Sequence, residues 1–105
     1  MENKQDFLNI LLKINKKPEI SQRNLSKELG ISLGKLNYCL KSLKNKGLVK
    51  IENFKINKHK YKYLYILTPK GISEKTKLTV NFMKVKLREY DRLKKELEKT
   101  SEKKF

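Results

Sequence analysis

The sequence predicts a mainly α-helical fold with one small β-hairpin, an α+β arrangement that ends in a long C-terminal helix. Two observations support this prediction. Capped amphipathic segments recur along the first half of the chain, and a lysine-rich stretch of strand-forming residues separates them from an uninterrupted helical region. With 105 residues, of which 37% are apolar, the chain can form one small domain with a modest core.

The first predicted helix runs from Asp6 to Lys16. Its apolar side chains recur at helical spacing and would form one buried stripe. They are Phe7, Leu8, Ile10, Leu11, Leu12 and Ile14. Pro18 ends this helix, because a proline disfavours the α conformation of the residue before it.

The second predicted helix begins at a strong start signal. Ser21 is a favourable N-cap, and Ile20 and Leu25 occupy the two positions of a hydrophobic staple. Gly30 supplies the left-handed residue that closes this helix.

The same start signal recurs at once in a third helix. Ser32 is its N-cap, Gly47 ends it, and the apolar stripe between them consists of Leu36, Leu40 and Leu43. Two short helices joined by a tight glycine turn predict a helix-turn-helix.

An antiparallel hairpin is predicted from residues 48–56 and 61–67, which are rich in β-branched and aromatic residues and contain no proline. Alternation alone leaves its inward face open. The competing residues are Tyr61, Tyr63, Tyr65 and Leu67 on one face and Leu64 and Ile66 on the other.

The last predicted helix begins with Thr68 as N-cap and Pro69 at the first helical position. We expect it to reach about Lys99, with a kink near residues 71–76 and a frayed tail at residues 100–105. Its apolar residues recur at steps of three and four, which is typical of a helix that pairs with another. This predicted dimerisation stripe consists of Val80, Met83, Leu87, Tyr90 and Leu97. We therefore divide the chain into residues 1–70, a nucleic-acid-binding domain, and residues 71–105, a coiled-coil-like dimerisation segment.

The net charge of +16 favours a polyanionic partner, namely DNA, RNA or an anionic membrane. An AT-rich genome would also produce a lysine-rich chain, so the charge needs support from the motifs.

In the third helix, the side chains outside the core stripe are suited to reading base edges. Asparagine pairs with adenine, lysine donates to guanine, and tyrosine meets a phosphate or a thymine methyl. The predicted contact residues are Ser32, Gly34, Lys35, Asn37, Tyr38 and Lys41. Gly34 lowers helix propensity, which a close approach to the DNA backbone would explain. The alternative is a solvated helix face.

Two other groups are predicted to contact the DNA backbone. Ser21, Gln22 and Arg23 lie at a helix N-terminus, where N–H groups and the helix dipole favour phosphate. The hairpin tip carries cations and no acid, which predicts a wing that follows phosphates or the adjacent minor groove. Its contact residues are Lys55, Asn57, Lys58, His59, Lys60 and Lys62. A solvated basic loop is the alternative.

Other function classes have little support. Cys39 is the single cysteine, so an internal disulfide is excluded and a reducing compartment is expected. His59 is the only histidine, and no glycine-rich phosphate loop or paired carboxylates occur, so we expect no enzyme, metal or cofactor. The N-terminus resembles neither a secretory signal nor a membrane span, which predicts a cytoplasmic protein that does not contact a membrane.

The order of these elements is that of a winged helix-turn-helix, which lays its recognition helix in a DNA major groove. Three segments resemble the MarR family of winged-helix regulators, and the short length and basic tail are similar to its small exopolysaccharide-associated branch. They are SQRNLSKELGIS at 21–32, LKSLKNKGLV at 40–49 and LTPKG at 67–71. The resemblance implies a homodimer that binds a palindromic operator and regulates transcription, and it matches the recognition-helix residues named above.

One departure from the family concerns the wing, which usually carries an Asp and an Arg two residues apart. This chain has Asn57, Lys58, His59 and Lys60 there, so a lysine or His59 would replace the minor-groove arginine. The helices that form an effector pocket in longer relatives are short or missing, so the resemblance does not imply a small-molecule effector.

Three alternatives remain open at this stage. The chain could be a winged-helix protein-interaction module, or a non-specific RNA or membrane-surface binder that uses its basic C-terminal helix. It could also be a thiol sensor through Cys39, although a buried hydrophobic role fits that position better.

Overall fold

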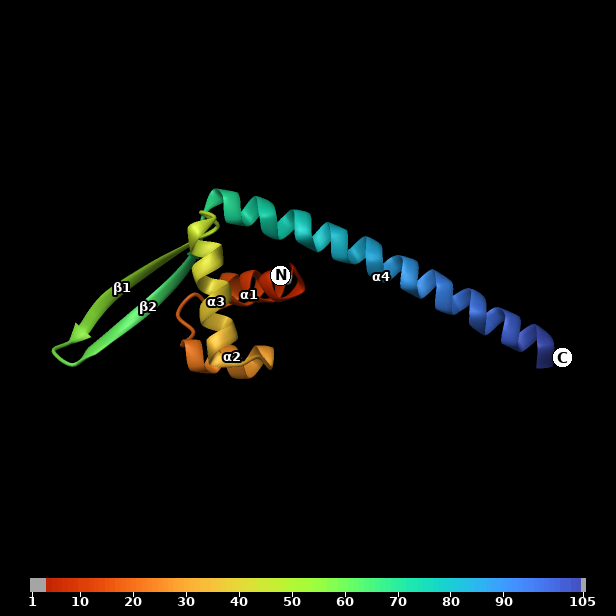
Figure 1. The fold of residues 1–105 in the computed structure, drawn as a ribbon, viewed down its shortest axis with the longest axis horizontal. Coiled ribbons are helices and arrows are strands. Elements are labelled where there is room, and N and C mark those ends of the chain that lie inside the picture. Colours follow the sequence, from red (N-terminus) through yellow and green to blue (C-terminus); the bar gives the residue numbers. More distant parts are fainter. Residues whose placement is uncertain (1–3, 105) are drawn as a thin grey trace.

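The computed structural model describes the backbone of residues 4–104 and the side chains of residues 4–100, and it shows the predicted mainly helical fold (Figure 1). The three short helices are α1 (Lys4–Lys16), α2 (Gln22–Leu29) and α3 (Leu33–Asn45). The strands β1 (Val49–Asn57) and β2 (Lys60–Leu67) form an antiparallel ribbon, and α4 (Pro69–Lys104) follows it. The predicted fold class is confirmed.

One hydrophobic core lies between the inner faces of α1, α2 and α3, the base of the ribbon and the first part of α4. Its buried members are Phe7, Leu8, Ile10, Leu11, Ile14, Leu25, Leu36, Cys39, Leu40, Leu43, Leu48, Val49, Tyr65, Leu67 and Leu78. The predicted stripes of the first and third helices are therefore confirmed, with Leu12 at the edge of the core. Cys39 is buried, as expected.

Local capping sets the orientation of α3 relative to α2. The Ser21 hydroxyl accepts a hydrogen bond from the Asn24 N–H at 3.1 Å, and the Ser32 hydroxyl accepts one from the Lys35 N–H at 3.1 Å. Gly30 adopts a φ of 68°, which an L side chain rarely does, and this left-handed residue reverses the chain between the helices. The predicted caps are confirmed.

The inward face of the ribbon is decided by a long-range hydrogen bond. The Tyr65 N–H donates to the Pro18 carbonyl at 2.9 Å, which attaches β2 to the loop between α1 and α2. Tyr65 and Leu67 are consequently buried, whereas Ile66 faces solvent. In the observed register Tyr65 pairs with Ile51, so these two residues share the inner face.

A polar clamp fixes the start of α4. The Thr68 hydroxyl donates to the Gly47 carbonyl at 2.6 Å and accepts from the Gly71 N–H at 3.0 Å. A Cβ atom at Gly71 would lie 1.9 Å from the Leu48 carbonyl oxygen, so only glycine fits this contact. The sequence analysis had treated Gly71 as the start of a kink.

In the structure α4 is one continuous helix from Pro69 to Lys104. The helix therefore extends past the expected end near Lys99, because a segment without Gly or Pro has nothing to stop it. The fraying of residues 100–104 stays a prediction. Residue 105 lies outside the described residues. The ribbon and α4 leave the core in opposite directions, which gives a molecule 73 Å long (Figure 1).

Candidate nucleic-acid interface

The outer face of α3 presents a mainly polar set of side chains, with Leu33 as an exposed apolar residue at its start. Leu36, Cys39, Leu40 and Leu43 point into the core, so the residues between them must face outward. The predicted contact residues are all exposed: Ser32, Gly34, Lys35, Asn37, Tyr38 and Lys41. Tyr38 is 60% exposed, so most of its side chain is accessible to a ligand. Their contact with DNA remains a prediction.

Lys35 is held in place by a residue that the sequence analysis did not identify. The Lys35 amine lies 2.8 Å from an Asp6 carboxylate oxygen, and the Asp6 side chain is only 15% exposed. The hydrogen bond to Asp6 and the negative charge of this carboxylate raise the pKa of Lys35. Asp6 in the first turn of α1 therefore orients the Lys35 side chain of α3. The two residues are far apart in sequence, so no local motif predicts this contact.

The start of α2 places its three predicted residues in different surroundings. Ser21 and Arg23 are exposed, as a phosphate contact requires. Gln22 is half-buried and approaches the buried Tyr65 hydroxyl, without forming a well-aligned hydrogen bond with it. Burial raises the pKa of Tyr65, and the Gln22 side chain partly opposes this rise.

The tip of the ribbon is exposed and basic. Lys55, Lys58, His59 and Lys60 all face solvent there, at the positions predicted for the wing. The Asn57 side-chain oxygen accepts a hydrogen bond from the His59 N–H at 2.9 Å. Asn57 therefore shapes the turn that displays the cations, a role that the sequence analysis did not assign to it.

Lys62 lies further along the ribbon, away from the tip. Its amine is 2.8 Å from a Glu19 carboxylate oxygen, so this part of the ribbon is tied to the loop between α1 and α2. Two of the predicted DNA-binding lysines, Lys35 and Lys62, thus have acidic partners within the protein.

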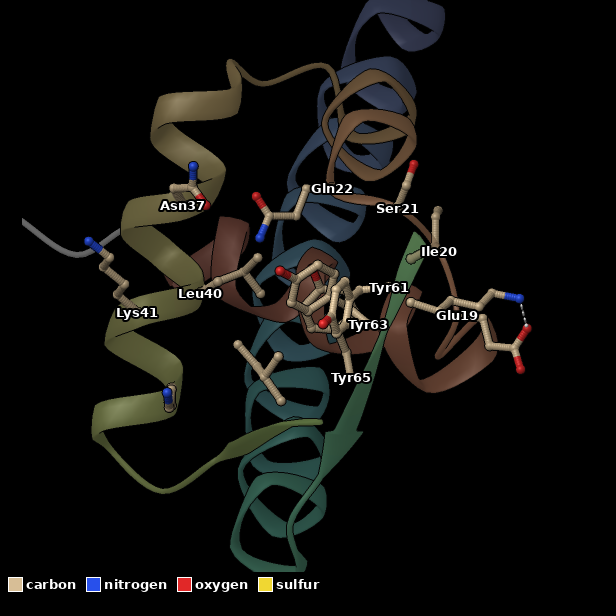
Figure 2. Close-up of a pocket in the computed structure, with 13 residues that line it drawn as sticks. Glu19, Ile20, Ser21, Gln22, Asn37, Leu40, Lys41, Tyr61, Tyr63 and Tyr65 are labelled. Carbon is tan, nitrogen blue, oxygen red and sulfur yellow. Dashed lines mark hydrogen bonds and ion pairs between the residues drawn. The ribbon is translucent and has the colours of Figure 1, made fainter. Parts of the chain in front are cut away.

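A groove of about 670 Å³ separates α3 from the ribbon. Asn37 and Lys41 of α3 lie on one side of it and the tyrosines of β2 on the other, with Gln22 between them (Figure 2). The predicted contact residues did not include Lys44, Tyr61 and Tyr63, which are among the residues that line this groove. The alternation of Tyr61, Tyr63 and Tyr65 was a visible signal, but it could not show which way the tyrosines face.

The predicted dimerisation stripe on α4 has no cover in the described chain. The exposed fractions are 43% for Val80, 66% for Met83, 60% for Leu87, 62% for Tyr90 and 67% for Leu97. Such a row of exposed apolar side chains on a projecting helix is typical of an interaction surface.

Other kinds of site find no support among residues 4–104. Among residues 4–100, whose side chains are described, no group of three or more His, Cys, Asp or Glu is placed to hold a metal ion. Over the same range, no helix combines the length and apolar character needed to cross a bilayer.

Comparison with known proteins places this geometry in a recognised fold. A family model described as a winged helix-turn-helix DNA-binding domain matches residues 8–50. No protein of curated function matches the chain. The structure is similar to several solved transcriptional regulators at low sequence identity.

The PcaV transcriptional regulator of Streptomyces coelicolor has a TM-score of 0.66 at 18% identity, over 75% of this chain and 55% of PcaV. AbsC, a MarR family regulator of the same species, has a TM-score of 0.67 at 18% identity, over 85% of this chain and 60% of AbsC. FabT of Streptococcus pneumoniae, solved in complex with DNA, has a TM-score of 0.60 at 24% identity, over 81% of this chain and 57% of FabT. This chain therefore has the winged helix-turn-helix fold and spans little more than half of these regulators.

Proposed function

We propose that this protein is a DNA-binding transcriptional regulator that acts as a homodimer on a palindromic operator. The observation that carries the proposal is the outer face of α3, which presents Lys35, Asn37, Tyr38 and Lys41 to solvent beside a basic wing. The fold is similar to that of FabT, which was solved in complex with DNA. Residues 1–70 bind DNA in this proposal, and residues 71–105 join two copies.

The recognition helix α3 enters the major groove with its first two turns. Asn37 pairs with an adenine edge, and Lys41 donates to guanine or to a phosphate. Lys35 keeps one ammonium hydrogen on Asp6 and has two left for a base, so the ion pair aims this lysine without using up its donors. The exposed Tyr38 ring lies on the same face and meets a thymine methyl or a phosphate.

The wing and α2 contact the DNA backbone on either side of the recognition helix. The ribbon tip, with Lys55, Lys58, His59 and Lys60, follows the phosphates or enters the flanking minor groove. The N-terminus of α2 offers N–H groups and Arg23 to a phosphate. Because most of the affinity comes from released counterions, binding weakens steeply as the salt concentration rises.

Two copies pair through the exposed stripe of α4. Val80, Met83, Leu87, Tyr90 and Leu97 form this interface. A two-fold axis through the pair presents two recognition helices to half-sites about one helical turn apart, roughly 34 Å, or a multiple of it.

Selection from random duplex DNA tests the proposal. The wild-type protein should enrich a palindrome, and the variant Lys35→Ala with Tyr38→Ala should lose this enrichment while its circular dichroism is unchanged. Lys27→Ala, which removes a positive charge from an exposed position outside the groove, is the matched control and should keep it. A wild-type protein that enriches no sequence would instead indicate a protein-interaction module or a non-specific nucleic-acid binder.

A further inference from the structure

We propose that the groove between α3 and the ribbon is a seat for the sugar–phosphate backbone of DNA, held by Tyr61 and Tyr63. The inference rests on the proposed DNA-binding function and deepens it, because it assigns backbone contacts to residues that the recognition helix and the wing tip do not include.

The first argument is the placement of the two tyrosines on one face of the ribbon. Tyr61, Tyr63 and Tyr65 alternate along β2, so their side chains lie on one face of the ribbon. Tyr65 is 1% exposed and fixed to Pro18 through its backbone, whereas Tyr61 and Tyr63 are 57% and 50% exposed. The row therefore begins in the core and continues into the open groove (Figure 2).

The second argument is the spacing of Tyr61 and Tyr63 along the strand. Residues two apart on an antiparallel strand are separated by roughly 7 Å. This separation is comparable to that of successive phosphates along one DNA strand. A phenol hydroxyl can donate to a phosphate oxygen, and its ring can pack against the adjacent deoxyribose.

The third argument is the charge on the opposite wall. Lys41 and Lys44 line the groove from α3, and neither forms an ion pair among the described residues. They differ in this respect from Lys35 and Lys62, whose charges are already matched by acids. A phosphate between the two walls would meet an ammonium on one side and a phenol on the other.

The fourth argument concerns the remaining lining. Leu40, Ile51 and the ring of Tyr65 form an apolar floor, which suits the carbon atoms of a deoxyribose. Glu19 also lines the groove and would repel a phosphate, but its carboxylate lies 2.8 Å from the Lys62 amine, which offsets its charge. The net charge facing a DNA strand in the groove is therefore positive.

The test measures binding to two fluorescent 30-base-pair duplexes, one with the selected operator and one of unrelated sequence. Tyr61→Phe with Tyr63→Phe keeps both rings and removes only the hydroxyls. We expect the dissociation constant to rise about tenfold or more on both duplexes, since hydrogen bonds to charged oxygens are lost, while the preference between them stays constant. Ser73→Ala on α4 removes an exposed hydroxyl outside the groove and off the dimerisation stripe, so it is the control and should bind like the wild type.

Lys44→Ala gives an independent measurement of the opposite wall. The slope of log Kd against log salt concentration should fall in magnitude by about one, as expected for one lost phosphate contact. Unchanged affinity of the double phenylalanine variant and an unchanged slope for Lys44→Ala, with wild-type binding intact, would overturn the groove assignment alone. If the wild-type protein bound neither duplex, the proposed function would fail as well.

Discussion

The part of the molecule up to Phe82 and the distal part of α4 differ in what covers their apolar side chains. In the first part, each helix has an inner face covered by another element of the same chain, and Leu78 and Phe82 are the last residues of α4 that pack against this core. In the distal part, apolar side chains recur at the same helical spacing but face solvent, for example Leu87 and Leu97. The first part therefore buries its apolar residues within the chain, whereas the distal part leaves them exposed, as the proposed dimer interface requires.

The difference follows from geometry more than from composition. A helix of 36 residues spans about 54 Å, which is longer than so small a core can cover. Lys94 interrupts the apolar row, and a polar residue at one seam position fixes the register of two paired helices at a cost in stability. If two copies pair through this helix as proposed, we expect Lys94 to fix their register.

The largest expected effect is the difference in unfolding free energy lost when a leucine is truncated in the first part and in the distal part. Leu43→Ala removes a fully buried side chain and should lower the free energy of unfolding by about 2–5 kcal/mol. Leu97→Ala changes a residue that is 67% exposed and should shift it by less than about 0.5 kcal/mol in dilute protein. Urea unfolding followed by circular dichroism measures both. Equal losses would show that the distal helix unfolds together with the core, which would remove the distinction.

The second effect concerns self-association. Leu87→Asp with Tyr90→Asp places two charges on the stripe and should give monomers in light scattering, with an intact fold. Operator affinity should fall roughly 100-fold or more, because two linked half-sites bind far more tightly than one.

The control for this variant is Asn81→Asp with Lys95→Gln, which changes the net charge equally at exposed positions off the stripe. It should remain dimeric. If the stripe variant also stays dimeric, the two copies meet through another surface.

The third effect compares the stability change caused by adding a Cβ atom at two glycines, one packed against backbone and one open to solvent. Gly71→Ala forces a Cβ against the Leu48 backbone where α4 joins the core, and should destabilise the protein by about 1–3 kcal/mol. Gly34→Ala adds a Cβ with no atom within 4 Å, and should stabilise α3 by up to about 1 kcal/mol.

If Gly34 lets α3 approach the DNA backbone closely, the stabilised Gly34→Ala variant should nevertheless bind operator more weakly. Thermal melts and fluorescence anisotropy on the same preparations give the two readouts. A stabilised variant with unchanged affinity would mean that Gly34 has no role at the interface.

The elements were predictable from sequence where local chemistry determines them. Ser21 and Ser32 cap their helices as expected, because an N-cap depends only on residues within one turn. The inward face of the ribbon was not predictable, since it depends on the hydrogen bond between Tyr65 and the distant Pro18. For the same reason Asp6 was not among the predicted site residues, because only the tertiary fold brings it next to Lys35.

The smallest effect tests how the two parts use their ion pairs. In the compact part, Glu28 of α2 contacts Lys17 at 3.2 Å and Lys13 at 3.7 Å, so it joins two elements. In the distal helix, the Lys86–Glu89 and Glu96–Lys99 pairs stay within one turn. Only the first kind of pair can hold the tertiary fold together.

The hydrogen bond from Lys17 lowers the pKa of Glu28 below its ordinary value of 4.5, with smaller contributions from the charges of Lys13 and Lys17. A carboxyl with a lowered folded-state pKa stabilises the protein above that ordinary value, and the contribution disappears as the pH falls through the lowered pKa. Glu28→Gln should therefore be slightly less stable than the wild type at pH 7, and the two should converge in acid. The difference in stability will be small, because Glu28 is solvent-accessible. Thermal melts from pH 2 to 7 measure it, with Glu98→Gln on the distal helix as the control. A Glu28→Gln profile parallel to the wild-type profile throughout would show that this pair does not join α1 to α2 energetically.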